Sequence, residues 1–590
     1  MSSTTDAGTP GALNPAQRQA AWDALVSEEW DVLVVGGGVT GAGVALDAAT
    51  RGLKVALVES RDLASGTSSR SSKLFHGGLR YLEMLDFGLV REALHERDLM
   101  LEKLAPHLVT PVPFLYPLKH RGWERPYVGA GLLLYDALAG RSPMPRHRHL
   151  TRRQALRRSP ALRPTALTGA LQYYDAATDD ARHTLTLART AAFYGATVRT
   201  STEVTGLVIE GSRVVGAHLR DVEDGRTGTV RARVVVGCTG VWSDFLHEMA
   251  GVPSPYRVRA SKGVHLLVPR DRIESSTGLI LRTEKSVLFV IPWGEHWVVG
   301  TTDTPWDLSL EHPAATRADI DYILDRVNEV LLQPITDDDI VGVYVGLRPL
   351  LAPADADSQS TTKLSREHQV AHPLPGLVTV AGGKYTTYRV MAEDTVDEAM
   401  TDLPVVVPPS VTEDVPLLGA AGYHATRNRE ASLASRYSLS REAVARMVGR
   451  YGDLVEEVLA PTLTDASLAQ PVPGAPQYLM AEMRYAATHE GALHLDDLLA
   501  RRTRISVDTV HRGVDSARAV ASLVAPLLGW SAEREQEEID AYLQRVERER
   551  ASQALPTDDV AQSVRSQAPD SRPMAAGRKV EQPQASAAAK

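Results

Sequence analysis

The chain of 590 residues is expected to be an α/β protein that combines a dinucleotide-binding unit, an antiparallel sheet and a helical C-terminal domain. Three observations predict this class. A strand, a glycine-rich turn, a helix and a second strand follow one another over residues 31–60. Short strands separated by turn signals occupy much of residues 203–302. Beyond the proline-rich segment 403–409, apolar residues repeat with helical periodicity.

The first unit begins with an apolar, β-branched run over residues 32–35, which is typical of a buried parallel strand. Gly36, Gly38 and Gly41 then fit the pattern G-x-G-x-x-G. In that pattern the glycines allow a tight turn, close approach of a pyrophosphate and close packing of the helix on the strand. The second strand ends at Glu59, whose carboxylate can accept hydrogen bonds from a ribose hydroxyl and disfavours a 2′-phosphate. This order of elements favours a dinucleotide site over a ligand-free βαβ turn.

The remaining elements follow from composition and periodicity. Residues 1–28 are expected to be a flexible extension with a short helix over 16–28, and residues 551–590 a disordered tail. Strands are expected over 203–237 (three of them), 263–269, 287–292, 297–302 and 377–383. Helices are expected over 441–451, 479–489 and 510–527.

The composition excludes several classes of protein. A net charge of −9 gives no support for nucleic-acid binding. The single cysteine, Cys238, excludes an intrachain disulfide framework and a cysteine-based metal cluster, and we expect no metal site. The N-terminus lacks a secretory signal, and the apolar segment 129–140 is too short to cross a bilayer. The protein is therefore expected to be cytoplasmic, or attached to a membrane from the cytoplasmic side.

Several further segments carry residues suited to chemistry. Residues 67–81 (TSSRSSKLFHGGLRY) can lie along a phosphate chain or flavin ring, the alternative being a polar surface loop. Gly240 ends an apolar strand, where a cofactor can approach the backbone closely. Arg348 stands between apolar residues, where it suits a structural ion pair, a carboxylate or a phosphate. Residues 382–389 (GGKYTTYR) open a helix with a glycine pair and Lys384, which favours an anion site.

Together these motifs resemble those of the FAD-dependent glycerol-3-phosphate dehydrogenases, which are membrane-associated respiratory enzymes. The matching pieces are VVGGGVTGAG, TSSRSSKLFHGGLRYLE, SKGVHLLVP, FVIPWG, VGTTDTP, GLRPL and GGKYTTYR, in family order from about residue 30 to 400. The helical region to about residue 550 also fits, whereas the N-terminal extension and the long tail depart from the compact bacterial pattern.

The resemblance implies an architecture. It consists of a Rossmann-like FAD-binding domain of the glutathione-reductase type, an antiparallel-sheet substrate domain and a helical C-terminal domain. The expected boundaries are 29–120, 180–255 and 345–400 for the FAD-binding domain, 121–179 and 256–344 for the substrate domain, and 410–550 for the helical domain.

The resemblance also implies roles for individual residues. Arg80 and Arg348 would hold a substrate phosphate with Lys384 close by, which suits a dianion that needs several fixed cations. His265 would face the substrate hydroxyl and take its proton, with His76 as the competing base. The remaining expected site residues are Tyr81 and a threonine of GTTD, Thr301 or Thr302, of which Thr302 is preferred. The alternative for His265 is a histidine packed in a strand.

The cofactor contacts expected from the same comparison extend beyond the glycine turn. They are Gly36, Gly38, Gly41, Glu59, Thr67, Ser68, Ser72, Lys73, His76, Gly77, Gly240, Gly383 and Thr386.

The implied reaction is oxidation of sn-glycerol 3-phosphate to dihydroxyacetone phosphate, with FAD as cofactor and a membrane quinone as electron acceptor. One alternative is an oxidase that reduces oxygen, acting on glycerol 3-phosphate or an amine. Phosphate-directed arginines disfavour the amine but do not separate an oxidase from a dehydrogenase. The other alternative is a flavin-binding or membrane-docking protein without turnover. A homodimer is possible.

A basic segment predicts peripheral attachment to the inner face of the cell membrane. Residues 117–163 carry eleven lysines and arginines against two acids, Glu124 and Asp136, and enclose the apolar run 128–138. Basic residues beside an apolar, aromatic patch suit an anionic lipid surface. The alternative is a solvated basic face over an ordinary core helix.

Overall fold

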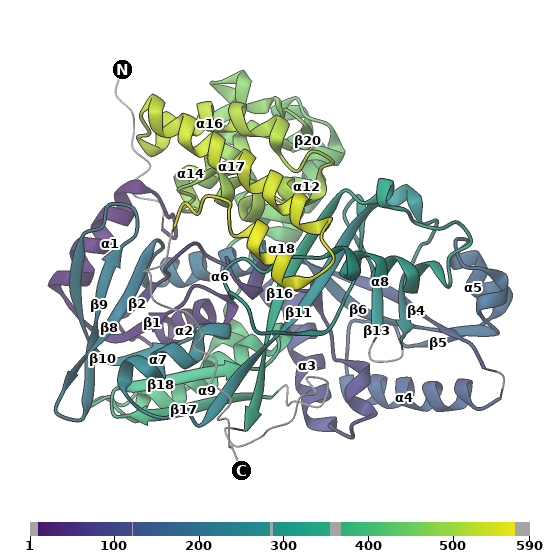
Figure 1. The fold of residues 1–590 in the computed structure, drawn as a ribbon, viewed down its shortest axis with the longest axis horizontal. Coiled ribbons are helices and arrows are strands. Elements are labelled where there is room, and N and C mark those ends of the chain that lie inside the picture. Colours follow the sequence, from purple (N-terminus) through teal and green to yellow (C-terminus); the bar gives the residue numbers. More distant parts are fainter. Residues whose placement is uncertain (1–9, 121, 284–286, 354–366, 573–590) are drawn as a thin grey trace, which may run out of the picture.

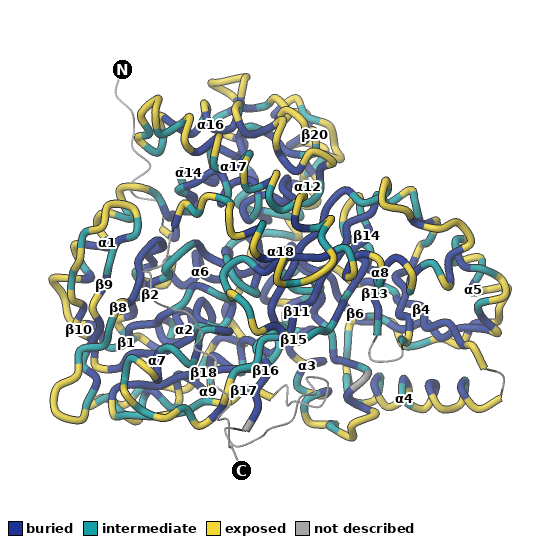
Figure 2. The backbone as a smooth tube through the Cα atoms, viewed as in Figure 1, coloured by how far each residue is buried: buried dark blue, intermediate teal, exposed yellow. Residues whose placement is uncertain are grey.

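The computed structural model describes residues 10–572 except 121, 284–286 and 354–366. Two sheets lie side by side, and a helical unit covers the junction between them (Figure 1). The buried residues follow the strands of both sheets and the inner faces of the helices (Figure 2).

The first sheet has the order β17-β18-β10-β1-β2-β7, with β8 and β9 attached to β10 as a meander. Its central strands β1, β2, β7, β10 and β18 are parallel. Their apolar side chains are buried under α2, α6 and α9 on one face. The bounds are β1 Glu29–Val35, α2 Val39–Thr50, β2 Val55–Val58, α6 Asp180–Phe193, β7 Thr197–Arg199, β8 Thr202–Glu210, β9 Arg213–Asp221, β10 Thr227–Gly237, α7 Ser243–Ala250, β17 His368–Leu374, β18 Leu377–Gly382 and α9 Tyr388–Met400.

The second sheet has the order β15-β11-β14-β13-β12-β4-β6-β3, with β16 paired to β11 and β5 to β6. Most of its pairs are antiparallel, β12 with β4 being parallel. The bounds are β3 Leu74–Phe75, β4 Val109–Leu118, β5 Arg148–Thr151, β6 Gly169–Thr178, β11 Tyr256–Pro269, β12 Gly278–Arg282, β13 Val287–Trp293, β14 His296–Gly300, β15 Thr304–Trp306 and β16 Gly342–Pro353. Helices α3 Phe87–Leu99, α4 Glu124–Ala139, α5 Arg152–Arg158 and α8 Arg317–Asn328 border it.

The second sheet shifts two of the expected domain boundaries. Strand β4 pairs along its whole length with β6, and β16 pairs with β11. Segments 109–118 and 342–353 therefore belong with the second sheet, although the sequence-based boundaries assign residues up to 120 and from 345 to the FAD-binding domain. These partners are distant along the chain, so the pairing cannot be read from local pattern.

The N-terminal extension is not flexible from residue 10 onward. Helix α1, Pro15–Ser27, begins at Asn14, whose side chain accepts a hydrogen bond from Gln17 N–H at 2.9 Å. Trp22 and Leu25 pack in the apolar cluster on the outer side of the first sheet. Burial of these apolar side chains stabilises the ordered segment, although its polar composition predicted flexibility. Residues 1–9 lie outside the described part.

The C-terminal unit is helical from residue 423, as its periodicity predicts. Its helices are α10 Tyr423–Asn428, α11 Glu430–Tyr437, α12 Arg441–Tyr451, α13 Val455–Leu459, α14 Met480–His489, α15 Ile505–Asp508, α16 Val514–Leu528 and α17 Ala532–Gln553, with a small hairpin of β19 Pro471–Val472 and β20 Ala475–Leu479.

The expectation of a disordered tail from residue 551 is wrong for residues 551–572. Helix α18, Asp558–Arg565, packs against α17, and the chain then returns to the body of the protein. Asp558 pairs with Lys262, Asp570 with Arg61 at 2.7 Å, and Arg572 with Asp497 at 2.7 Å. The tail is held by charge pairs, which a composition-based prediction of disorder does not detect. Residues 573–590 lie outside the described part.

Candidate active site at the junction of the two sheets

The glycine turn after β1 is built for close backbone approach. Gly36 has a φ of +114°, and a Cβ there would lie 2.6 Å from the carbonyl oxygen of Cys238. A Cβ at Gly41 would lie 1.9 Å from the carbonyl oxygen of Gly36, so only glycine lets α2 pack against the turn. A Cβ at Gly38 would meet only the hydroxyl of Ser68, at 3.2 Å. The fold of the chain therefore restricts position 38 much less than position 41, and the space beside Gly38 is open to a ligand.

Glu59 is fixed at the end of β2 by backbone donors. Gly37 N–H donates to Oε2 at 2.6 Å, and Arg61 N–H donates to Oε1 at 2.8 Å. Burial raises the pKa of Glu59 above its usual value, against the effect of these hydrogen bonds. The carboxylate is held beside the glycine turn, where the sequence pattern expects a ribose contact.

These residues line one continuous cavity, called here the dinucleotide cavity, with about 1440 Å³ of empty space including open solvent. Gly36, Gly38 and Glu59 line it, and so do Val39 and Thr40 at the N-terminus of α2, the end of a helix that favours an anion. Of the other expected cofactor contacts, Thr67, Ser68, Gly240 and Gly383 line it as well. The open space at Gly38 and the glycine-lined walls fit a dinucleotide such as FAD.

Other expected cofactor contacts lie elsewhere. Lys73 is buried against Asp180 with 2.8 Å between its Nζ and the carboxylate, so its charge is used inside the protein. Gly77 packs against Leu94, where a Cβ would lie 2.6 Å from a side-chain carbon. The hydroxyl of Thr386 accepts a hydrogen bond from His76 N–H at 3.2 Å. These three residues shape the walls and do not line the dinucleotide cavity.

Sequence reasoning missed several lining residues. Ser71, Thr239, Trp242 and Arg61 line the dinucleotide cavity. Ser71 lies within the segment 67–81 that had been singled out, so the signal was present there. Trp242 lies two residues after Gly240 in the chain, but nothing in its local pattern marks it.

A second cavity, called here the adjacent cavity, opens beside the first. Ser72, His76, Tyr81, Thr301 and Arg348 line its inner part. Lys384 lines the dinucleotide cavity, and its Nζ lies 3.6 Å from the centre of the Tyr81 ring, which lines the adjacent cavity. The two cavities therefore meet at Lys384 and Tyr81, as a cofactor site and a substrate site must for chemistry to occur.

Arg348 lies on β16, and its guanidinium is directed to the short segment between β14 and β15. It donates to Thr301 Oγ1 at 3.1 Å and to the carbonyl oxygen of Thr302 at 3.3 Å, and Asp303 lies 3.6 Å away. Thr301 and Arg348 line the adjacent cavity. The hydroxyl of Thr302 instead accepts a hydrogen bond from Val264 N–H at 3.0 Å. The structure thus places Thr301, and not the preferred Thr302, at the site.

Arg80 lies in the short helix Leu79–Leu82, which borders the same cavity through its neighbours Leu79 and Tyr81. The side chain of Arg80 lies outside what the structure describes, so its expected contact with a phosphate stays a prediction.

His265 lies one layer behind the cavity wall. Its Nε2 is 2.9 Å from the hydroxyl of Ser72, and its ring stacks on Tyr344 at a centroid distance of 4.8 Å. Burial, reinforced by the charges of Arg348 and Lys73, holds the pKa of His265 well below its usual value. The imidazole is therefore neutral at pH 7 and reaches the cavity through Ser72, whereas His76 lines the cavity directly.

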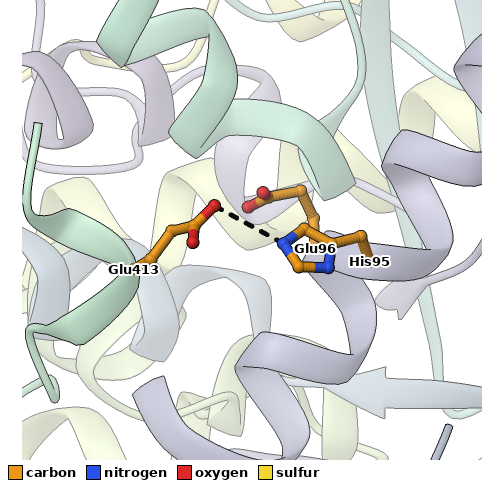
Figure 3. A group of neighbouring side chains, drawn as sticks. All are labelled: His95, Glu96 and Glu413. Carbon is orange, nitrogen blue, oxygen red and sulfur yellow. Dashed lines mark hydrogen bonds and ion pairs between the residues drawn. The ribbon is translucent and has the colours of Figure 1, made fainter. Parts of the chain in front are cut away.

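Two groups of side chains have the residue types of a metal site. In each group, however, a neighbouring arginine already pairs with a carboxylate. His95, Glu96 and Glu413 converge between α3 and the segment after α9 (Figure 3). Arg389 pairs with Glu96 at 2.7 Å and with Glu413 at 3.1 Å, so the carboxylates already have a cation. In the second group, Glu311, His312 and Asp570, Arg61 pairs with Asp570. We assign no metal to either group.

Comparison with known proteins agrees with this geometry. Residues 31–389 match the family described as FAD dependent oxidoreductase, and residues 410–535 match the C-terminal domain of alpha-glycerophosphate oxidase. The site and fold thus define a flavin-dependent oxidoreductase.

Relatives narrow this class. Glycerol-3-phosphate dehydrogenase 2 of Mycobacterium tuberculosis is 59% identical over 561 residues, which cover 95% of each chain. The mitochondrial glycerol-3-phosphate dehydrogenase of Homo sapiens is 37% identical, covering 90% of this chain and 75% of the human one. The chain belongs to the glycerol-3-phosphate dehydrogenase family.

A solved structure shares the fold. The glycerol-3-phosphate dehydrogenase from Bacillus halodurans, complexed with FAD, superposes with a TM-score of 0.74 at 29% sequence identity, over 90% of this chain and 98% of that one. Within the described residues, no helix has both the length and the apolar character needed to cross a bilayer.

Proposed function

We propose that the protein oxidises sn-glycerol 3-phosphate to dihydroxyacetone phosphate and passes the electrons to a membrane quinone. The observation that carries the proposal is the meeting of the dinucleotide cavity with a cavity that contains Arg348 beside Lys384 and Tyr81. The names of the relatives agree with this substrate. Bound FAD would supply the acceptor for two electrons.

The cations at the junction suit a phosphate ester. Arg348 offers a guanidinium fork that is oriented by Thr301 and Asp303, and Lys384 adds a second positive charge. A phosphate dianion is held best by several fixed donors of this kind. Binding the phosphate at this end would direct the carbinol carbon of the substrate toward the dinucleotide cavity.

The hydroxyl proton has a route into the protein. The neutral ring of His265 can accept a hydrogen bond from Ser72, whose hydroxyl is in the cavity wall. We propose that the proton leaves the substrate through Ser72 to His265, with His76 as the alternative acceptor. Because burial opposes the charged imidazole, we propose that His265 takes the proton while the substrate is being oxidised.

The mechanism is tested by anaerobic rapid mixing. Glycerol 3-phosphate should bleach the flavin absorbance of the wild type, whereas glycerol at the same concentration should not. His265→Ala and Ser72→Ala should each slow bleaching by roughly 100-fold or more, because general-base catalysis typically contributes this much. A wild type that is not bleached contradicts the proposed reaction. Normal rates in both variants with a slow His76→Asn would assign the proton to His76.

An apolar surface beside the adjacent cavity supports the membrane part of the proposal. Met84, Leu85 and Phe87 are 53%, 72% and 42% exposed and line the mouth of the cavity. On the neighbouring helix α4, Tyr127 and Leu133 are 52% and 64% exposed, and α4 lies at the periphery of the molecule (Figure 2). A quinone dissolved in a bilayer could reach the site from this side.

Basic side chains flank this apolar surface. Arg146, Arg148, Arg152 and Arg153 are exposed on the segment that follows α4. The two acids of residues 117–163 each have a partner within the protein. Glu124 accepts a hydrogen bond from His120 N–H at 2.7 Å, and Asp136 pairs with His147 at 2.7 Å. Exposed arginines beside exposed apolar residues favour an anionic lipid surface, each contributing about 1 kcal/mol near the surface.

Vesicle flotation tests this attachment. The wild type should float with anionic vesicles at low salt, and a variant with these four arginines changed to Glu should not. A matched control carries the same change at Arg427, Arg436, Arg441 and Arg518, which are exposed on the C-terminal helices, and should float. A wild type that stays unbound with every vesicle composition, and forms hydrogen peroxide in air, would favour the oxidase instead.

The proposed homodimer is checked by light scattering after gel filtration.

A further inference from the structure

A third cavity lies where the loop 60–70, the second sheet and the C-terminal helices meet. Arg70 from the loop and Arg501, Arg504, Arg545 and Arg565 from the C-terminal unit line it, together with serine hydroxyls. Asp496 and Glu549 are the only carboxylates among the described residues that line it. We call this space the arginine cavity.

Both carboxylates form ion pairs with arginines of the wall. Asp496 pairs with Arg501 at 2.6 Å and with Arg545 at 3.1 Å. Glu549 pairs with Arg545 at 2.9 Å and with Arg565 at 3.0 Å. Each carboxylate is thus shared between two guanidinium groups. Arg501 and Arg504 have further carboxylate partners behind the wall.

Arg70 is the surplus cation. Within the described part of the chain, no carboxylate lies within 4 Å of its guanidinium and no side-chain hydrogen bond is made by it. Burial, reinforced by the nearby charges of Arg501 and Arg565 and opposed by those of Glu549 and Asp496, lowers the pKa of Arg70 to about 10. A desolvated guanidinium among other guanidinium groups is destabilising unless an anion compensates it.

A hydrogen-bond donor of the cavity also lacks an acceptor. Nη2 of Arg545 is buried without a hydrogen-bond acceptor in the described structure. Ser65, Ser69 and Ser552 add hydroxyl donors to the wall. Several guanidinium forks with hydroxyls suit a compact, multiply charged anion with several acceptor oxygens, which is the chemistry of a phosphate group.

We propose that the arginine cavity is a second anion site, which binds a phosphate dianion, either free phosphate or the phosphate of a monoester. It does not depend on the proposed substrate, because none of its arginines lines the adjacent cavity. The wall includes Tyr344, which stacks on His265, and the loop of Arg70 also carries Thr67 and Ser68 of the dinucleotide cavity. An anion bound there ties the cofactor loop to the strand beneath the active site.

The test uses the flavin-loaded, full-length protein carrying Arg348→Gln, so that phosphate bound at the active site does not contribute. Titration calorimetry and thermal unfolding are measured with inorganic phosphate, and separately with glycerol 2-phosphate, at constant ionic strength set with chloride. We expect phosphate to bind and to raise the Tm, because a ligand of the folded state stabilises it. Binding of both probes assigns phosphate monoesters to the site, and binding of phosphate alone assigns the free ion.

Variants separate a binding role from a structural one. Adding Arg70→Gln or Arg565→Gln should weaken phosphate binding at least tenfold and remove the rise in Tm, whereas Arg441→Gln, an exposed control, should change neither. In phosphate-free buffer Arg70→Gln should be at least as stable as its parent, because it removes an uncompensated charge. Equal phosphate stabilisation of parent and Arg70→Gln, or a loss of stability of Arg70→Gln without phosphate, overturns the proposal.

Discussion

At the scale of single residues, the glycine turn separates requirements of folding from requirements of binding. Gly41 is needed by the chain itself, because a Cβ would overlap the carbonyl oxygen of Gly36 at 1.9 Å. Gly38 faces the dinucleotide cavity and has only a hydroxyl at 3.2 Å from the place of a Cβ. We therefore expect glycine to be needed for folding at position 41 and for cofactor binding at position 38.

This difference predicts different outcomes for matched substitutions. Gly38→Val should fold but be purified without flavin, because its side chain occupies the space of the pyrophosphate. Gly41→Val should fail to give a folded protein. Circular dichroism and the flavin absorbance of the purified proteins distinguish the two. A yellow Gly38→Val variant with normal affinity for FAD would contradict the assigned role.

Arg348 makes a second prediction at this scale. Arg348→Lys keeps the charge but loses the fork that Thr301 and Asp303 orient. The loss of one charge-assisted hydrogen bond, about 1.5–3 kcal/mol, should raise KM for glycerol 3-phosphate by roughly 10- to 100-fold. Steady-state kinetics measures this, with Arg326→Lys on α8 as the control. An unchanged KM would place the phosphate elsewhere.

At the scale of helices and strands, the sequence predicted the elements whose signals lie close together along the chain. The βαβ unit with Gly36 and Glu59 was predictable, because all its signals lie within thirty residues of one another. The place of β4 and β16 in the second sheet was not, because their partners are far along the chain. The contact of His265 with Ser72 could not be predicted either, because 193 positions separate the two residues in the chain.

The tail shows the same limit, and its charge pairs lead to a prediction. Arg572 is 3% exposed and makes a bidentate ion pair with Asp497, at 2.7 and 2.8 Å. Arg572→Ala leaves that buried carboxylate with one ion-pair partner, Arg501, and with the backbone N–H groups of Leu493 and His494. Breaking a buried pair typically costs about 3–5 kcal/mol, and the remaining partner favours the lower end of that range.

Urea unfolding followed by fluorescence should show this loss of stability. Arg518→Ala, an exposed arginine on α16, should change the free energy of unfolding by less than about 0.5 kcal/mol. If the two variants unfold at the same urea concentration, α18 and the segment after it do not hold the domains together.

At the scale of the whole molecule, buried histidines affect the pH dependence of stability in opposite directions. Burial lowers the pKa of His107 and of His183 to about 3 each. Burial opposes the charge of His494 too, but its hydrogen bonds to Glu223 and Glu538 prevail and raise its pKa to about 9. At neutral pH these shifts favour the neutral form of His107 and His183 and the charged form of His494.

These shifts predict a stability maximum near neutral pH. His107 and His183 have folded pKa values below the unfolded value of about 6.5, so the unfolded state binds more protons in acid, and stability falls as the pH drops from about 6.5 toward 3. Each contributes a slope of up to about 1.4 kcal/mol per pH unit. His494 has the opposite sign: its contribution is complete below about 6.5 and is lost as the pH rises through about 9.

The free energy of urea unfolding, measured from pH 5 to pH 9.5, should therefore decline on both sides of neutrality. His494→Gln should be less stable than the wild type at pH 6 but should lose less stability between pH 7 and pH 9.5, because the group that deprotonates there is gone. His183→Gln should flatten the acid side and leave the alkaline side unchanged. Because the two substitutions act on opposite limbs of one curve, each serves as the control for the other. Parallel curves for all three proteins would show that neither histidine governs the pH dependence.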